Sequence, residues 1–312
     1  MKLSPIVLFV CKRPKHTRRV LSSLKKNKLY KLSNLIIYVD KPDKEEDLKS
    51  YNKVLEIIKN IKGFKKKTLI LRSKNYGLAK NFIDGITRIF KKYKKAIILE
   101  DDNLISPYFL DFMNNALEIY KNNKKISSIY AYFPNTKTSF NENFFLKGSW
   151  TFTWGIGIWR RSWRYFQADE GKLLQQIDNK KLQRKFNFDN TYDWYSMLQR
   201  FKNKQNKSWS IRWYASTFLK NYYTLFPKYP LCKNIGMDGT GENTPKSNIW
   251  DVKLYRKKIN IKRIKVQESK IAYDSAKYFF KSIEPIHLKF FNFIKKKIYI
   301  FLKTLIDFKP QK

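Results

Sequence analysis

The stretch Ala96-Ile97-Ile98-Leu99-Glu100-Asp101-Asp102 does most to decide the fold class. Its four apolar residues are typical of a short buried strand, and three carboxylates follow directly. The chain carries 66 Lys and Arg against 25 Asp and Glu, so adjacent acids are unusual in it. Their mutual repulsion requires a compensating cation. Divalent metals accept such oxygens and often share them with nucleotide phosphates. Because open α/β sheets bind ligands at strand ends, the stretch predicts a metal–nucleotide site.

The three acids could instead have a purely structural role at the N-terminus of the helix that follows. Helix N-termini attract negative charge, and residues 107–120 are expected to be helical. The acids, however, end five residues before that helix and adjoin the strand instead. The ligand-binding interpretation is therefore favoured.

Outward from this stretch, apolar strands alternate with amphipathic helices. The expected strands are 5–11, 35–39, 68–71 and 96–99, and the expected helices are 15–26, 44–62 and 79–93. Such alternation is typical of a parallel, doubly wound sheet with helices on both faces. The sequence thus predicts an α/β fold.

The pattern changes after residue 105, and no internal repeat is visible. Helices are expected at 107–120, 160–166, 171–179 and 192–204, strands at 126–132 and 209–218, and a loop at 231–248. The predicted organisation is a nucleotide-binding half (1–125), an aromatic-rich acceptor half (126–250), a connecting segment (251–284) and a basic tail (285–312). The two halves are expected to share one body, because no linker separates them.

Composition permits a globular fold and limits the class of partner. With 312 residues, 43% of them hydrophobic, the chain can form one large domain or two small ones around an ample core. The net charge of +41 favours anionic partners such as nucleic acid, acidic lipid or phosphorylated substrates. Lysine is spread along nearly the whole chain, however, as an AT-rich coding bias would produce. The charge alone therefore does not identify a dedicated binding patch.

The cysteines and the N-terminus restrict the cellular environment. Cys11 and Cys232 are the only cysteines, so neither a metal knuckle nor a disulfide framework is expected, and a reducing cytosol is compatible with the chain. Residues 1–10 have too short an apolar run for a signal peptide and no small-residue cleavage site. No stretch reaches about 18 uncharged apolar residues, so no membrane-spanning helix is expected.

Polar residues follow three of the predicted strands. Arg13 follows the first strand, Asp40 the second, and the acidic triplet (residues 100–102) the fourth. In a doubly wound sheet these strand ends lie along one rim. A guanidinium pairs well with a phosphate, and Asp40 could accept hydrogen bonds from a base or a ribose. Asp40 also precedes Pro42, which is typical of an ordinary turn.

Three ordered stretches resemble the GT-A glycosyltransferases, and more narrowly the inverting N-acetylglucosaminyltransferase I family and its bacterial sugar-transferase relatives. Residues 9–13 and 18–21 are similar to that family's first strand and helix. Residues 99–109 are similar to its metal motif and the helix that follows. Residues 155–159, together with Tyr192-Asp193-Trp194, are similar to its acceptor-side segment and catalytic base. The resemblance spans roughly residues 5–245 and implies a Rossmann-like, mixed but mostly parallel sheet.

The resemblance also implies a role for each polar residue on the donor side. Asp102 would bind the metal, Mn²⁺ or Mg²⁺, directly, and Asp101 would hold the ribose. Glu100 would lie on the sugar or ribose side. Asp40 would read the uracil, and Arg13 would lie near the nucleotide phosphates. The chemistry requires such groups, because charge grows on the departing diphosphate and must be neutralised.

Asp193 is the catalytic base that the resemblance implies. An inverting transfer is one in-line displacement, in which a base removes the proton of the acceptor hydroxyl. Tyr192 and Trp194 flank Asp193 and would raise its proton affinity by excluding water. Alternatively, Asp193 is only the N-cap of the helix that starts at Trp194, and Asp189 is a rival base.

The late segment 234–243 departs from the family pattern, since it lacks the histidine that the family often carries there. Its glycines would let it close over the donor as a lid; the alternative is a flexible surface loop. His16 and His287 are the chain's two histidines. Neither histidine matches a catalytic or ligand-binding pattern, so neither is expected to have a catalytic or binding role.

Seven of the eight tryptophans lie between residues 150 and 213. Indole faces stack well on sugar rings, so these residues could bind an acceptor; alternatively, most of them fill the core of the second half. Trp150 and Trp154 precede Gly155, where the backbone can approach a ligand closely. These two are the predicted acceptor contacts.

The C-terminal tail predicts an amphipathic helix. Residues 286–308 repeat apolar side chains at helical spacing, and Lys289, Lys296 and Lys303 recur seven apart on the opposite side. A basic helix of this kind binds the interface of an anionic membrane. The alternative is a helix docked on the body of the protein with its lysines in water.

Together these features predict a metal-dependent inverting glycosyltransferase in a prokaryotic cytoplasm, peripheral at the inner face of the cell membrane. Its donor would be a nucleotide-diphosphate sugar, with a UDP-sugar favoured. Its acceptor would be a glycan or a lipid-linked oligosaccharide in cell-surface polysaccharide synthesis, such as that of lipopolysaccharide. One alternative is a basic nucleic-acid-binding protein, which no recognition motif supports. Another is a sugar nucleotidyltransferase on a similar sheet.

Overall fold

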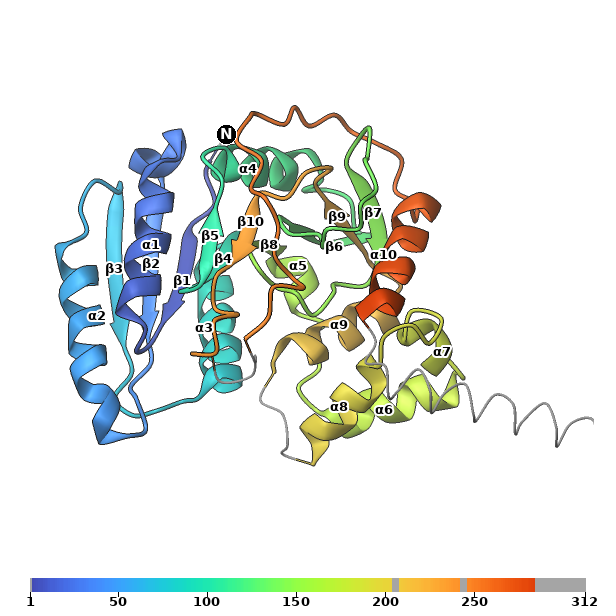
Figure 1. Ribbon diagram of the computed structural model, residues 1–312, viewed down its shortest axis with the longest axis horizontal. Coiled ribbons are helices and arrows are strands. Elements are labelled where there is room, and N and C mark those ends of the chain that lie inside the picture. The colour runs from blue at the N-terminus through green and yellow to red at the C-terminus, as the bar shows by residue number, and fades with distance from the viewer. Residues whose placement is uncertain (1, 204–207, 242–245, 284–312) are drawn as a thin grey trace, which may run out of the picture.

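The computed structural model describes residues 2–203, 208–241 and 246–283, and its centre is one large sheet (Figure 1). The sheet has eight strands in the order β3-β2-β1-β4-β8-β6-β9-β7. A separate antiparallel pair joins β5 to β10. The strand bounds are β1 Ile6–Val10, β2 Asn34–Val39, β3 Lys66–Leu71, β4 Lys95–Glu100, β5 Asn103–Ile105, β6 Ile126–Tyr130, β7 Phe144–Lys147, β8 Ile156–Trp159, β9 Tyr223–Phe226 and β10 Cys232–Asn234.

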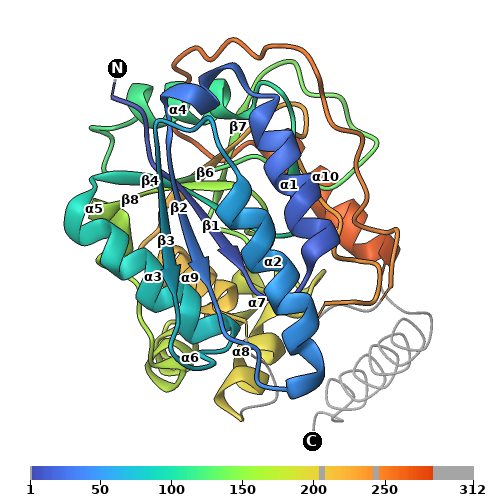
Figure 2. The same ribbon diagram turned by 90° about the vertical axis from the view of Figure 1, so that its left-hand side faces the viewer.

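The N-terminal part of the sheet is parallel. Strand β2 pairs with β3 and β1, and β1 also pairs with β4, all in the same direction. Strand β1 is apolar and buried throughout, as expected where helices cover both faces. Helices α1 (Pro14–Lys25) and α2 (Leu48–Asn60) lie on one face, and α3 (Leu78–Lys92) lies on the other (Figure 2). The predicted doubly wound α/β arrangement is confirmed.

Helix α3 approaches the sheet closely at one glycine. Its buried residues Phe82, Ile86 and Ile89 recur at helical spacing. Gly85 lies on the same face, and a Cβ there would be 2.7 Å from the Phe9 ring of β1. The absence of a side chain at this position therefore lets α3 pack directly on the sheet, with its N-terminus near the strand ends.

The second part of the sheet mixes directions. Strand β8 pairs antiparallel with both β4 and β6, β9 runs parallel to β6, and β7 is antiparallel to β9. Helices α6 to α9 gather at one end of this part (Figure 1). The remaining helix bounds are α4 Phe109–Ile119, α5 Arg160–Trp163, α6 Glu170–Asn179, α7 Gln183–Phe186, α8 Trp194–Lys202, α9 Ser210–Leu219 and α10 Lys270–Ile283. Short 3₁₀ turns lie at Lys28–Leu32 and Glu45–Asp47.

One predicted strand is a helix in the structure. Residues 209–218 were expected to be extended, but they form most of α9. Every residue from Ser210 to Thr217 is buried, so the helix is enclosed on all sides and shows no polar face. Polar side chains such as Arg212, Ser216 and Thr217 are buried along with the aromatic ones. The sequence therefore shows no helical alternation of polar and apolar faces. The loop predicted at 231–248 likewise contains the short strand β10.

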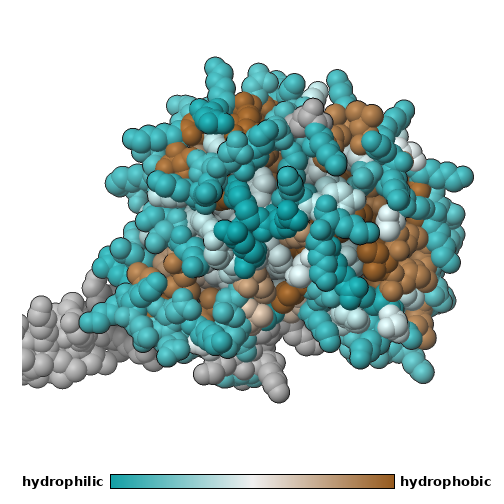
Figure 3. Space-filling view, turned by 180° about the vertical axis from the view of Figure 1, so that it is seen from behind, coloured by the Kyte–Doolittle hydropathy of each residue, from teal (hydrophilic) through white to brown (hydrophobic). Residues whose placement is uncertain are grey.

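The C-terminal part is described as far as Ile283. Helix α10 lies beside β7, within the predicted connecting segment. The predicted tail helix at 285–312 lies outside the described residues. In the described ranges, no helix combines the length and apolarity needed to cross a bilayer. Hydrophilic side chains cover most of the back of the molecule, with hydrophobic patches between them (Figure 3).

Candidate active site

A cleft of about 1,020 Å³ opens at the carboxyl ends of β1, β2 and β4. One wall carries Arg13, Asp40 and the acidic triplet, all from the N-terminal half. The opposite wall comes from the second half of the chain, and its lining includes residues 151–154, Tyr192, Met197, Arg200, 208–210 and Trp250. The structure thus brings together the polar residues that follow the first, second and fourth of the predicted strands.

Arg13 is the cation that compensates the acidic triplet in this structure. Its Nη2 donates to Asp102 Oδ2 at 2.8 Å and also to Asp101 Oδ1. Only 19% of the Arg13 side chain is exposed, and the two carboxylates are more buried still. Burial lowers the pKa of Arg13, but the two aspartates raise it overall, so the guanidinium stays charged. Burial raises the pKa of Asp101, and Arg13 opposes that shift.

Glu100 links the triplet to the opposite wall. Thr153 Oγ1 donates to Glu100 Oε1 at 3.5 Å. Burial and the neighbouring charge of Asp102 raise the pKa of Glu100 to about 8, while Arg13 acts in the other direction. The three acids therefore differ in surroundings, because Asp101 and Asp102 share Arg13 whereas Glu100 faces a hydroxyl group.

Asn103 fixes the shape of the triplet and was not identified from the sequence. Its Nδ2 donates to Asp102 Oδ1 at 2.8 Å. Its Oδ1 accepts from the backbone nitrogens of Glu100 and Gly155, each at 3.1 Å. The side chain is fully buried, so all of these bonds are shielded from water. The one available signal was a polar residue directly after the triplet, at the start of an otherwise apolar segment.

Asp40 lines the cleft and also anchors a loop. Its Oδ1 accepts from the backbone nitrogens of Lys41 at 3.0 Å and Tyr76 at 2.9 Å. Burial raises the pKa of Asp40, and these N–H groups partly offset the shift. Arg72 lies over the Tyr76 ring at 4.4 Å and pairs with Asp84 of α3 at 2.6 Å. Asp40 thus both borders the cleft and holds the segment that leads into α3.

The late segment lies directly against the triplet. Ile235 N donates to the backbone oxygen of Asp102 at 2.9 Å, next to the β5–β10 pair. A Cβ at Gly236 would collide with Asp102 Oδ2 and would lie 2.7 Å from Arg13 Nη1. Glycine is therefore needed for this backbone to cover the ion pair. Met237, Thr240 and Gly241 of the same segment line the cleft.

His16 reaches this segment from α1. Its Nε2 is 3.1 Å from Ile235 O and 3.1 Å from Asp238 Oδ2. The sequence had given no reason to connect His16 with the site, because the contact joins residues more than 200 positions apart. The segment without a histidine of its own is thus contacted by a histidine from the first helix.

The two predicted acceptor tryptophans differ in position. Trp154 lines the cleft together with Phe152. Trp150 does not belong to the lining and is only 1% exposed. Its ring packs in the core against Trp194 and Phe226, at centroid distances of 6.0 and 5.3 Å. The position of Trp150 therefore fits a core residue and does not fit the expected acceptor contact.

Other aromatic residues at the cleft were not singled out from the sequence. Phe9 stacks on Phe82 with centroids 3.9 Å apart, and Phe82 stacks on Trp209 at 5.2 Å. All three line the cleft, as does Trp250, which lies 4.5 Å from Phe152. Stacked and tilted rings of this kind form a stable apolar wall.

The candidate base Asp193 caps a helix. It is exposed and outside the cleft lining, although its neighbour Tyr192 belongs to that lining. Asp193 Oδ1 accepts from Ser196 N at 3.1 Å, which is N-cap geometry for α8. The rival Asp189 pairs with Lys277 at 2.9 Å. Hydrogen bonding to Lys277 lowers the pKa of Asp189.

The residues of the triplet fit a divalent cation that shares its coordination with a ligand. Among the described residues, no group of three or more His, Cys, Asp and Glu could hold a metal by itself. Mg²⁺ commonly binds through one or two carboxylates plus substrate phosphates. Asp101 and Asp102 provide such carboxylates in the cleft, although Asp102 Oδ2 is bonded to Arg13 here.

Comparisons with known proteins give one family and a set of distant structures. No curated protein matches the chain. Residues 1–152 match the model of the GNT-I family.

Several solved structures are similar at low sequence identity. They include S. aureus TarS 1-349 in complex with UDP-GlcNAc (13% identity, TM-score 0.33, 56% of this chain and 47% of that chain). Mouse xyloside xylosyltransferase 1 is another (10%, 0.36, 68% and 80%). A third is a putative nucleotide-diphospho-sugar transferase from Desulfovibrio desulfuricans (13%, 0.32, 54% and 69%). The aligned part of this chain spans about half the length of TarS 1-349. The family match confirms the predicted resemblance for the first part of the chain: residues 1–152 are similar to the GNT-I family.

Proposed function

We propose that this protein transfers a sugar, with inversion, from a UDP-sugar to a hydroxyl group of a glycan or lipid-linked oligosaccharide. The observation that carries the proposal is the cleft itself, in which Arg13, Asp101 and Asp102 face a wall of aromatic side chains. A charged wall suits the diphosphate and ribose of a nucleotide donor. An aromatic wall suits the apolar faces of sugar rings.

On the donor side, Arg13 would exchange partners when the nucleotide binds. Its guanidinium now bonds two carboxylates, and diphosphate oxygens offer it an equivalent charged partner. Asp102 would then hold Mn²⁺ or Mg²⁺, with Asp101 toward the ribose. When bound, the cation neutralises charge on the leaving diphosphate. Asp40 would contact the uracil, and Glu100 the sugar or ribose side.

On the acceptor side, Asp193 is the proposed base and Trp154 a proposed contact. Tyr192 lines the cleft immediately before Asp193, so a modest change at the start of α8 would bring the carboxylate toward an acceptor hydroxyl. Apo geometry does not exclude a base whose hydrogen bonds form only in the complex.

The acceptor and location follow from the tail and the chemistry. Residues 285–312 are proposed to bind the anionic inner face of a bacterial cell membrane as a peripheral anchor. A lipid-linked oligosaccharide intermediate of lipopolysaccharide or another surface polysaccharide would be presented at that face. We expect no nucleic-acid partner.

A donor screen tests the proposal. UDP-sugars are added to the full chain with and without Mn²⁺, and the melting temperature is measured, because a ligand at 100 times its Kd adds about 2.7 kcal/mol of stability. We expect at least one UDP-sugar to raise the melting temperature, and more so with Mn²⁺. Asp102→Ala should remove the Mn²⁺-dependent part, whereas the surface variant Asp274→Ala should keep it.

The same screen can contradict the proposal. No shift with any UDP-sugar, or an unchanged Mn²⁺-dependent shift in Asp102→Ala, would refute the assigned donor site. Release of pyrophosphate from a nucleoside triphosphate would instead identify a nucleotidyltransferase.

A further inference from the structure

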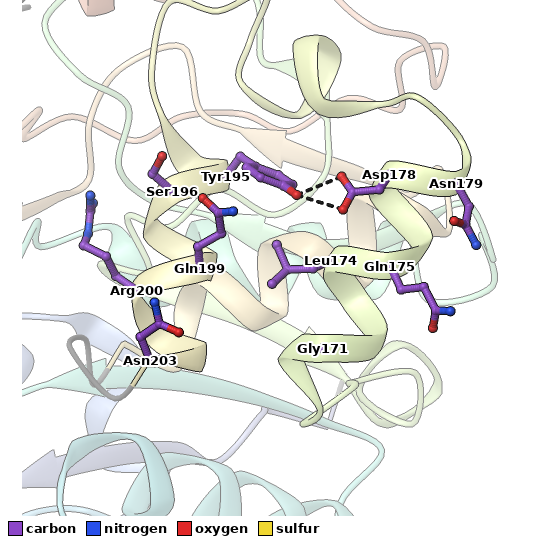
Figure 4. A pocket seen from close by; sticks show the side chains of 10 residues that line it. All are labelled: Gly171, Leu174, Gln175, Asp178, Asn179, Tyr195, Ser196, Gln199, Arg200 and Asn203. Atoms are coloured by element: carbon purple, nitrogen blue, oxygen red, sulfur yellow. Dashed lines mark hydrogen bonds between the residues drawn. The ribbon is translucent and has the colours of Figure 1, made fainter.

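A second pocket lies outside the cleft, between the adjacent helices α6 and α8 (Figure 4). Its volume of about 650 Å³ is within the range of small-molecule sites. Helix α6 supplies Asp178 and Gln175, and helix α8 supplies Tyr195, Gln199 and Arg200. Neither the family match, which ends at residue 152, nor the catalytic roles proposed above involve this pocket.

One wall of the pocket is fixed by a strong polar pair. The Tyr195 hydroxyl lies 2.8 Å from both carboxylate oxygens of Asp178 and donates to that carboxylate (Figure 4). Hydrogen bonds to an ionised acceptor are stronger than neutral ones, so the Tyr195 ring is held in place. Leu174 lies between the two helices in the same view. The pocket therefore combines a positioned aromatic ring and an aliphatic side chain with polar groups.

Carboxamide groups supply much of the remaining lining. Gln199 and Asn203 are four residues apart along α8 and its extension, so they lie on one side of it. In the part of the chain that the structure describes, the side-chain amides of Gln175, Gln199 and Asn203 form no hydrogen bond with other protein groups. Each amide both donates and accepts, which matches the paired donor and acceptor character of sugar hydroxyl groups.

The charge of the described lining favours a neutral ligand over a polyanion. The whole chain has 66 Lys and Arg against 25 Asp and Glu. Among the residues that the structure describes, however, this lining contains Arg200 and Asp178 as its charged side chains and no lysine. The pocket is therefore close to neutral in a very basic protein. Polyanion sites depend on a surplus of cations, so the lining favours a neutral, hydroxyl-rich ligand.

The pocket adjoins the proposed active-site cleft. Arg200 lines both cavities, and Met197, less than one helical turn before it, lines the cleft. Helix α8 is thus the ridge between the two. A chain of sugars whose end lies in the cleft would cross α8 to reach the pocket.

From these observations we infer that the α6–α8 pocket is a subsite for a neutral oligosaccharide, occupied by the part of the acceptor that lies beyond the reacting sugar. The identification of this ligand as part of the acceptor rests on the proposed function. It specifies the acceptor as a chain of several neutral sugars rather than a single sugar on a lipid.

A glycan array with the purified full chain tests the inference. The array carries neutral oligosaccharides of two to six sugars (cello-, malto- and chito-oligosaccharides) beside sialylated and sulfated glycans. We expect binding to neutral glycans that strengthens with length. The double variant Gln199→Ala/Asn203→Ala should lose about tenfold in affinity, since two hydrogen bonds are removed. Gln176→Ala, an exposed glutamine of α6 outside the lining, should bind like the wild type.

The donor site is measured in the same samples by the melting-temperature shift with UDP. Absence of neutral-glycan binding by the wild type, equal binding by the double variant, or binding of acidic glycans alone would overturn the inference. A lost UDP shift with intact, Gln199-dependent glycan binding would instead refute the proposed donor site and leave the pocket as a glycan site. Melting temperatures without ligand verify that each variant is folded.

Discussion

The two walls of the cleft use different physical chemistry. The wall from the N-terminal half concentrates charge, with Arg13 bonded to Asp101 and Asp102. The wall from the second half is built largely from aromatic rings, such as the tilted pair of Phe152 and Trp250. Ligand binding at the charged wall depends on individual charges and on the backbone that covers them. At the aromatic wall, packing depends on the volume of the side chains. The comparison therefore predicts different kinds of damage on the two sides.

The walls also differ in how the backbone positions their side chains. The charged residues follow parallel strands, so the sheet itself sets their positions along one rim. The aromatic residues of the opposite wall come from the segment before β8, from the N-terminal ends of α8 and α9, and from a late loop. Their positions depend on packing among many side chains. Variants in each wall test this difference.

The largest effect is expected at Asp193, the proposed base, which follows Tyr192 of the aromatic wall. Asp193→Asn should lower the transfer rate by about 10²–10⁴-fold if the carboxylate is the base. Asparagine is as good an N-cap as aspartate, so the melting temperature should change little. Steady-state kinetics with the identified donor and acceptor, together with thermal unfolding, measure both effects.

Asp193→Ala serves as the matched comparison. It should lose the same activity and, in addition, about 0.5–2 kcal/mol of stability, because the bond to Ser196 N is lost. If Asp193→Asn transfers sugar at the wild-type rate, the carboxylate is only a helix cap and the base lies elsewhere.

A comparable but structural effect is expected in the aromatic half. Trp150→Ala should lower the free energy of unfolding by about 3–5 kcal/mol, because a fully buried indole leaves a cavity. Trp154→Ala should also destabilise, but it alone should raise the KM for the acceptor, because Trp154 lines the cleft. Chemical denaturation and acceptor kinetics separate the two. A raised acceptor KM in a well-folded Trp150 variant would contradict the core assignment.

A smaller effect is expected where the late loop covers the charged wall. Gly236→Ala places a methyl group against Asp102 Oδ2 and Arg13 Nη1, so the loop must move away from the ion pair. We expect UDP affinity to fall about tenfold, or about 1.4 kcal/mol, with little change in melting temperature. Titration calorimetry with UDP measures the loss. Unchanged affinity would show that the loop does not need to lie against the ion pair for UDP to bind.

Much of the N-terminal half could be predicted because its signals are local. Alternating strands and helices, and polar residues after three of the four strands, place Arg13, Asp40 and the triplet on one rim before any contact is known. In the second half, secondary structure could not be predicted where all sides of an element are equally buried. In α9 every residue from Ser210 to Thr217 is buried, so no polar face reveals the helix.

Local sequence was enough to predict the α/β class, the rim of charged residues and the resemblance to the N-acetylglucosaminyltransferase I family, because strand ends and short motifs are encoded by neighbouring residues. Tertiary structure alone decided that Arg13 neutralises Asp101 and Asp102, that Asn103 ties the triplet to Gly155, and that His16 meets the late loop. It also decided that Trp150 belongs to the core. The physical reason is that periodicity shows which face of an element is buried, whereas the partner on that face depends on how distant elements pack.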